Sequence, residues 1–131
     1  MKSLTQSVLI FTAFLCALLN GTVQLAFAQK HQRYEDAHAA VQTTLDDLDH
    51  VINQDPEHDT GQARARIVSA RKSLSEFDRS LSNNKFNRRS LKSAMNNIRM
   101  VVNKNPVGAK ERDGLLADLY NLSHLHSVSG K

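Results

Sequence analysis

The sequence predicts an all-α fold, an up-down-up-down four-helix bundle built from two pseudo-repeated helical hairpins. Apolar residues recur at intervals of three and four, as they do on one face of a helix. The apolar pattern of residues 41–56 returns in residues 91–106. No stretch alternates between apolar and polar residues with the period of a strand. Short connections favour antiparallel neighbours. The alternative is an open pair of hairpins that completes its core by dimerising.

Residues 1–28 are predicted to form a secretory signal peptide. Lys2 supplies a positive start, residues 8–19 are almost wholly apolar, and the triplet Ala-Phe-Ala at 26–28 has the form of a cleavage site. The apolar stretch is shorter than the roughly 18 to 20 residues that span a bilayer as a helix. We therefore expect export to the periplasm or the outside of the cell, with cleavage after Ala28.

The part after the leader, residues 29–131, contains no cysteine, because Cys16 is the only one in the chain. Disulfides therefore cannot stabilise the exported domain, although its compartment would permit them. About 100 residues are enough for one domain with a modest core. No stretch after the leader is apolar for long enough to cross a membrane. We expect one cysteine-free domain that exists as a monomer or homodimer.

The first hairpin is expected over about 30–82. Its two helices carry apolar seams at helical spacing: Tyr34, His38, Val41, Leu45, Leu48 and Ile52 in the first, and Ala63, Ile67, Ala70, Leu74, Phe77 and Leu81 in the second. Pro56 ends the first helix, because proline cannot continue one. Asp59 and Gln62 can form a capping box for the second. Residues 82–84 connect this hairpin to the next.

The second hairpin is expected over about 86–126. Asn87 is a suitable N-cap for its first helix, with Phe86 stapled onto Leu91. Pro106 closes that helix.

The last helix is predicted to begin near Ala109, with Glu111 in its first turn. Residues 127–131 are expected to be a frayed tail.

Two pseudo-repeats organise the chain. At a shift of fifty positions, five apolar residues of the first half fall on five of the second: Val41, Leu45, Leu48, Val51 and Ile52 on Leu91, Met95, Ile98, Val101 and Val102. Beyond each proline the returning helices also correspond. Each half is thus a helix, a proline turn and a returning helix, which predicts pseudo-twofold symmetry.

With its leader, its paired helices and the segments VVNKNP and ERDGLLADLYNL, the chain resembles small exported bacterial helical proteins that have no assigned activity. The likeness covers the latter half best. It implies a bacterial, periplasmic setting, and it transfers no site, substrate or cofactor.

Charge is divided unevenly along the chain. Residues 30–55 have a balance of −4, whereas residues 62–104 have a balance of +9. The candidate anion or partner surface consists of Arg64, Arg66, Arg71, Lys72, Arg79, Arg88, Arg89 and Lys92. Such a surface would attract anionic lipid, lipopolysaccharide or polysaccharide. Nucleic acid is disfavoured, because export separates the protein from it and the basic stretch has no tryptophan or tyrosine for stacking bases.

The alternative interpretation of this charge pattern is internal pairing. The acidic residues Asp46, Asp47 and Asp49 can neutralise arginines of neighbouring helices within the bundle. The arginines considered are Arg66, Arg71 and Arg99.

Histidines suggest a metal site as an alternative function. An up-down bundle brings the start of the first helix near the end of the last, so five candidate ligands could converge: His31, Glu35, His38, His124 and His126. Imidazole and carboxylate groups of this kind suit Zn, Cu or Ni. The other interpretation makes His38 a hydrogen-bonded, partly buried seam residue. A haem bound through Met95 or Met100 is a narrower variant, and core filling and an edge position explain these methionines more simply.

Four large side chains should gather at one end of the bundle: Tyr34, Phe77, Phe86 and Leu125. They could form a core plug or a docking patch for a partner. No nucleophile motif, phosphate-binding glycine loop or acid-base pair is recognisable in the sequence. The sequence therefore predicts a non-enzymatic exported binding or interaction module without a cofactor, which presents helix faces to a protein or an anionic envelope component.

Overall fold

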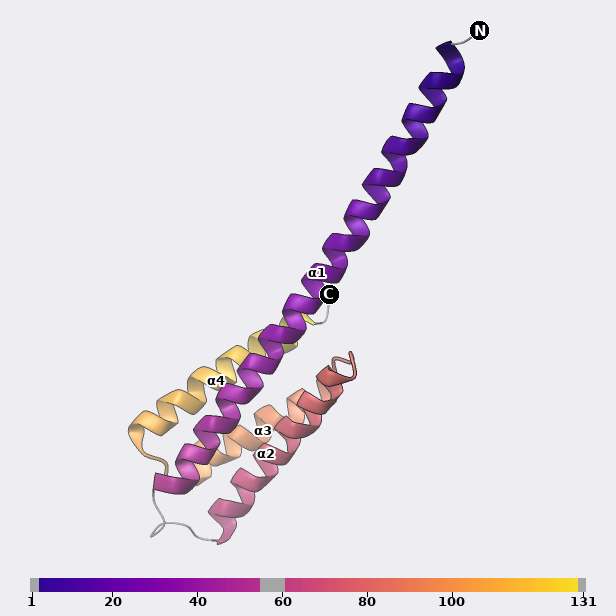
Figure 1. Ribbon diagram of the computed structural model, residues 1–131. Coiled ribbons are helices and arrows are strands. Elements are labelled where there is room, and N and C mark those ends of the chain that lie inside the picture. The colour runs from indigo at the N-terminus through magenta and orange to yellow at the C-terminus, as the bar shows by residue number, and fades with distance from the viewer. Residues whose placement is uncertain (1–2, 55–60, 130–131) are drawn as a thin grey trace. The chain divides into compact units, whose positions relative to one another are not determined.

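The computed structural model describes the backbone of residues 3–54 and 61–129, with side chains from Val23 onward. It contains four helices, α1 (Ser3–Gln54), α2 (Gly61–Ser82), α3 (Arg88–Lys104) and α4 (Ala109–Val128) (Figure 1). The all-α prediction is therefore confirmed. Within the described residues, none of these helices is both long and apolar enough to cross a membrane.

The chain divides into two compact units, residues 1–33 and 34–131. The first unit is helical from Ser3 onward, and its described side chains, including Val23 and Phe27, are exposed. Most of the predicted leader, the turn at Pro56 and the Asp59 cap fall outside the residues whose side chains are described. Cleavage after Ala28 stays a prediction.

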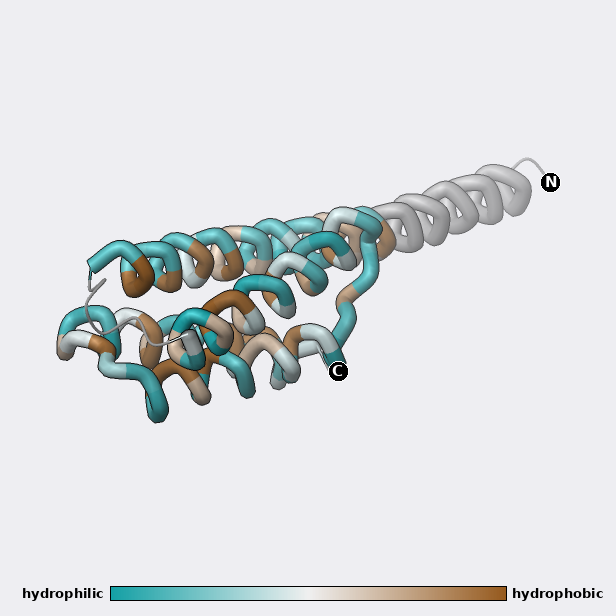
Figure 2. The backbone as a smooth tube through the Cα atoms, turned by 90° about the horizontal axis from the view of Figure 1, so that it is seen from below, coloured by the Kyte–Doolittle hydropathy of each residue, from teal (hydrophilic) through white to brown (hydrophobic). Residues whose placement is uncertain are grey.

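In the unit 34–131 the four helices pack antiparallel, as in a four-helix bundle. Between α1 and α2, His38 meets Asp78 and Asp49 meets Arg71, so the two helices run in opposite directions. Between α2 and the end of α3, Ser73 meets Ser93 and Arg66 meets Asn105, which again shows opposite directions. Helix α4 contacts α3 where Arg88 meets His126, and it contacts α1 where Asp47 approaches Gly114. The apolar segments turn toward one another between the helices, and the polar segments turn outward (Figure 2).

The core forms from the predicted seams, with one correction in α1. All six seam residues of α2 are buried. In α1 the fully buried positions are Ala37, Val41, Thr44 and Leu48, whereas the predicted Leu45 is only half-buried. The buried stripe is therefore rotated relative to the predicted one. Thr44 can be buried because its hydroxyl donates to the Ala40 carbonyl at 2.8 Å, which satisfies its hydrogen-bonding capacity within the helix.

The connection between α2 and α3 is a Schellman turn. The Asn84 amide donates to the Leu81 carbonyl at 2.8 Å, and the Lys85 amide donates to the Ser80 carbonyl at 2.9 Å. Asn84 has φ 55°, a left-handed conformation that asparagine tolerates better than most residues. The turn satisfies the last carbonyls of α2 and reverses the chain into α3.

Caps and a proline set the limits of α3. The Asn87 side chain accepts hydrogen bonds from the amides of Arg89 and Ser90, both at 3.1 Å, so its predicted capping role is confirmed. The helix ends before Pro106, as predicted. Asn105 closes it and is buried, and its side-chain amide donates to the Ala63 carbonyl at 3.0 Å. That bond ties the end of α3 to the start of α2.

The last helix, α4, begins at Ala109 with Glu111 in its first turn, as predicted. It continues through Val128, past the predicted end at 126.

The aromatic residues at the α2–α3 end form a core plug. The ring of Phe77 is fully buried and meets that of Phe86 edge-on, with centroids 5.2 Å apart. The Tyr34 ring lies 6.5 Å from Phe86, and its hydroxyl donates to the Asn84 carbonyl at 3.1 Å. Leu125 packs half-buried against the same core. Of the two interpretations of these residues, the structure supports the plug.

Candidate functional site

Helix α3 and the part of α1 within the bundle carry charges of opposite sign. Helix α3 carries five basic residues and no acidic one. The part of α1 within the bundle, residues 34–54, carries five acidic residues and neither lysine nor arginine. The potential around α3 is therefore positive, and the potential around this part of α1 is negative.

Three of the eight predicted surface cations are committed to contacts within the bundle. Arg71 forms an ion pair with Asp49 at 2.8 Å, as the pairing hypothesis expected. Arg66 instead donates to the Asn105 side chain at 3.1 Å, which steadies the end of α3. Arg88 donates to the His126 carbonyl of α4 at 3.3 Å.

The other predicted pairings took a different form. Arg99 donates to the Asn96 side chain of its own helix at 3.0 Å, rather than to an aspartate of α1. Asp47 meets Asp118, not an arginine. Of the three acids considered, Asp49 is therefore the one that forms the expected interhelical ion pair within the described residues.

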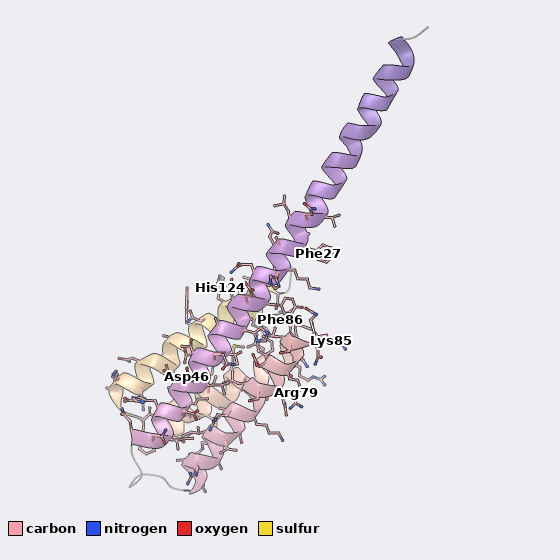
Figure 3. All side chains as sticks on the ribbon, viewed as in Figure 1. Phe27, Asp46, Arg79, Lys85, Phe86 and His124 are labelled. Carbon is pink, nitrogen blue, oxygen red and sulfur yellow. The ribbon has the colours of Figure 1, made fainter. Side chains whose placement is uncertain are left out.

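Five predicted cations are exposed on α2 and α3 without being needed for these interhelical contacts: Arg64, Lys72, Arg79, Arg89 and Lys92. The side chains of the last four make no hydrogen bond or ion pair with any part of the chain that the structure describes. Arg79 lies in the last turn of α2, and Lys85 follows in the connection, close to the start of α3 (Figure 3). Lys72, Arg79, Arg89 and Lys92 are called the cationic surface below.

The candidate metal ligands do not converge where their side chains are described. No group of three histidine, cysteine, aspartate or glutamate side chains within residues 23–54 and 61–129 could hold a metal ion. His38 Nδ1 lies 2.6 Å from Asp78 Oδ1 on α2, so this seam histidine links two helices. His124 is exposed on α4, and the carbonyl of His126 accepts the Arg88 bond.

The two other candidates, His31 and Glu35, are exposed, and His31 belongs to the first unit. The haem variant gains no support from the methionines. Met95 is buried in the core, and Met100 is exposed on α3.

The structure contains an acidic pair, one buried and one half-buried aspartate, that sequence reasoning missed. Asp118 of α4 lies within the core and meets Asp47 of α1. Burial, then the charge of Asp47 and its polar contact with Asp118, raise the pKa of Asp118 to about 7, while the nearby Thr44 hydroxyl acts in the opposite direction. One oxygen of Asp118, Oδ2, is buried without a partner in the described structure. At neutral pH Asp118 therefore holds a proton part of the time.

Local features allow the acidic pair to form. Gly114 lacks a side chain where Asp47 approaches α4, and a Cβ there would lie 2.8 Å from Asp47 Oδ2. Asp118 follows Leu115 by three residues, on the inward face of α4. This spacing could have indicated from the sequence that Asp118 faces the core. It was missed because an aspartate is usually exposed to solvent.

Comparison with known proteins found no matching family model, no matching curated protein and no matching solved structure.

Proposed function

We propose that the chain is a non-enzymatic, exported binding module whose cationic surface on α2 and α3 binds an anionic component of the cell envelope. One observation carries this proposal. Lys72, Arg79, Arg89 and Lys92 have no partner in the described structure, although acidic residues are abundant on α1. Cations that are not used to stabilise a fold remain available to a partner, and their joint field attracts anions before contact.

The finer architecture is part of the same proposal. Two pseudo-repeated hairpins would explain why the matched residues Val41 and Leu91, and again Leu48 and Ile98, are all fully buried. The predicted leader and the resemblance to small exported bacterial proteins support a periplasmic setting. The proposal assigns no catalytic residue and no cofactor.

Retention on heparin at increasing salt tests the anion surface. The protein, expressed from the full sequence, should bind heparin at about 0.05 M salt and elute before about 0.5 M. Salt ions compete with the contacts between the basic side chains and the sulfate groups of heparin, so these contacts weaken as the salt concentration rises. The double variant Arg89→Gln/Lys92→Gln should elute at clearly lower salt.

The matched control is Lys110→Gln/Arg112→Gln, which removes the same charge from the first turn of α4. It should elute closer to the parent protein than the α3 variant does. Equal effects of the two variants would show that net charge, and not the cationic surface, governs retention. Retention that is unchanged by salt would overturn the proposal.

A further inference from the structure

A groove of about 590 Å³ lies between α1 and α4. Four residues of α1 and four of α4 line it: Asp36, Ala39, Ala40, Thr43, Tyr120, Asn121, His124 and Leu125. Figure 3 labels His124 near the end of α4, beside α1. We propose that this groove binds a substituted ammonium group, held between the Asp36 carboxylate and the Tyr120 ring.

The floor of the groove is largely apolar. Ala39 and Ala40 present only methyl groups, and Leu125 is half-buried beside them. The Thr43 hydroxyl donates to the Ala39 carbonyl at 3.1 Å, so its hydrogen is used within the helix. Small side chains on α1 thus leave room for a compact ligand, and the volume falls within the usual range for small-molecule sites of about 300 to 1,000 Å³.

Polar and aromatic groups stand at the edge of this floor. Tyr120 is 74% exposed, so its ring is available beside the groove and is not committed to the core. The side chains of Tyr120, Asn121 and His124 make no hydrogen bond within the described residues. An aromatic face together with a carboxylate is the combination that recognises organic cations, because the ring attracts the cation and the carboxylate neutralises it.

The charge around the groove also favours a cation. Residues 34–54 of α1 contain no lysine or arginine, and the carboxylates Glu35 and Asp36 lie at the end of this segment that borders the groove. None of the groove residues is a lysine or arginine. An anion would therefore meet unfavourable potential there, whereas a cation is attracted. This site is separate from the cationic surface, and its ligand carries the opposite charge.

Two ligand sources share this chemistry: a small quaternary ammonium compound and the side chain of a lysine in a peptide. Choline represents the first, and Nα-acetyl-lysine methylamide represents the second. The tighter of the two probes identifies the source. The neutral compound 3,3-dimethyl-1-butanol has nearly the shape of choline without its charge, so it isolates the contribution of the cation.

Nuclear magnetic resonance titration of protein purified from the full chain tests the site. At least one cationic probe should give saturable shift changes centred on the amides of Asp36, Tyr120 and His124, with a dissociation constant of about 10 mM or lower. The neutral compound should bind about tenfold more weakly. Absence of saturable binding by both cations, or equal binding of choline and its neutral analogue, would overturn the proposal.

Variants then locate the site. Asp36→Asn and Tyr120→Leu should each weaken binding about fivefold or more, since one removes the countercharge and the other removes the aromatic face. The matched control is Asp46→Asn, which removes the same charge from an exposed position of α1 outside the groove. It should change affinity less than about twofold. An equal effect of the two asparagine variants would contradict binding in the groove. Heparin retention of Tyr120→Leu should equal that of the parent protein, so this test is independent of the anion surface.

Discussion

The charge of Asp47 on α1 acts on the carboxyl group of Asp118 across the contact between α1 and α4, where Asp118 is only 4% exposed. Burial and a neighbouring negative charge both disfavour the ionised form of a carboxyl group, so Asp118 holds its proton to a higher pH than an exposed aspartate does. Burial and the Asp47 charge together place the pKa of Asp118 at about 7, within the range where a small pH change alters the charge of the core.

Stability should therefore increase as the pH falls from about 8 to about 5. The unfolded chain titrates this group near 3.8, whereas the folded state holds the proton up to about pH 7. Ionisation above about pH 7 thus penalises the folded state fully, and the penalty disappears as the pH falls toward 4. Urea denaturation should show a free energy of unfolding that is higher at about pH 5 than at about pH 8, with Asp118 contributing about 1 to 3 kcal/mol.

The control for this prediction is Asp118→Asn, which keeps the shape and cannot ionise. Its stability should change much less between the same pH values. If the variant kept the full pH dependence of the parent protein, other groups would be responsible.

Asn84 should be replaceable by glycine but not by alanine. Its φ of 55° suits a residue without a Cβ, and the Schellman hydrogen bonds depend on that conformation. Asn84→Ala should lower the free energy of unfolding by about 1 kcal/mol, and Asn84→Gly should leave it unchanged or slightly higher. Thermal denaturation followed by circular dichroism compares the two variants. An alanine variant as stable as the glycine variant would contradict a left-handed turn residue.

Phe77→Ala should cost about 3 to 5 kcal/mol, because it removes a fully buried ring and leaves a cavity beside Phe86. Tyr120→Ala is the matched control, since it truncates an aromatic residue that is largely exposed. It should change stability by no more than about 0.5 kcal/mol. Chemical denaturation measures both. Similar losses in the two variants would argue against a plug centred on Phe77.

Sequence periodicity predicted the fold well where apolar residues alone define the stripe. The seam of α2 from Ala63 to Leu81 was predicted residue by residue, and so was the cap at Asn87. It was less accurate in α1, where the buried stripe includes Thr44. A threonine whose hydroxyl bonds within its own helix behaves as a buried residue, and hydropathy does not reveal this bond.

The candidate sites were harder to predict for a related reason. Charge patterning identified the cationic helices, but it could not separate Arg66, which donates to Asn105, from Lys72, which has no partner in the described residues. The choice depends on which residue of a distant segment lies opposite. The same holds for Asp118, because its interaction with Asp47 depends on how closely α1 approaches α4 at Gly114.

The two polar links between α1 and α2 restrict how these helices can be aligned. His38 meets Asp78 at 2.6 Å, and Asp49 meets Arg71 at 2.8 Å, at positions eleven residues apart on α1. Apolar residues repeat along each helix, so a shift of α1 along α2 by one turn, about 5.4 Å, would still pack apolar side chains against each other. Such a slip would separate both polar pairs at once. The two polar pairs therefore select the native register of α1 against α2 over registers shifted by one turn, which apolar packing alone does not do.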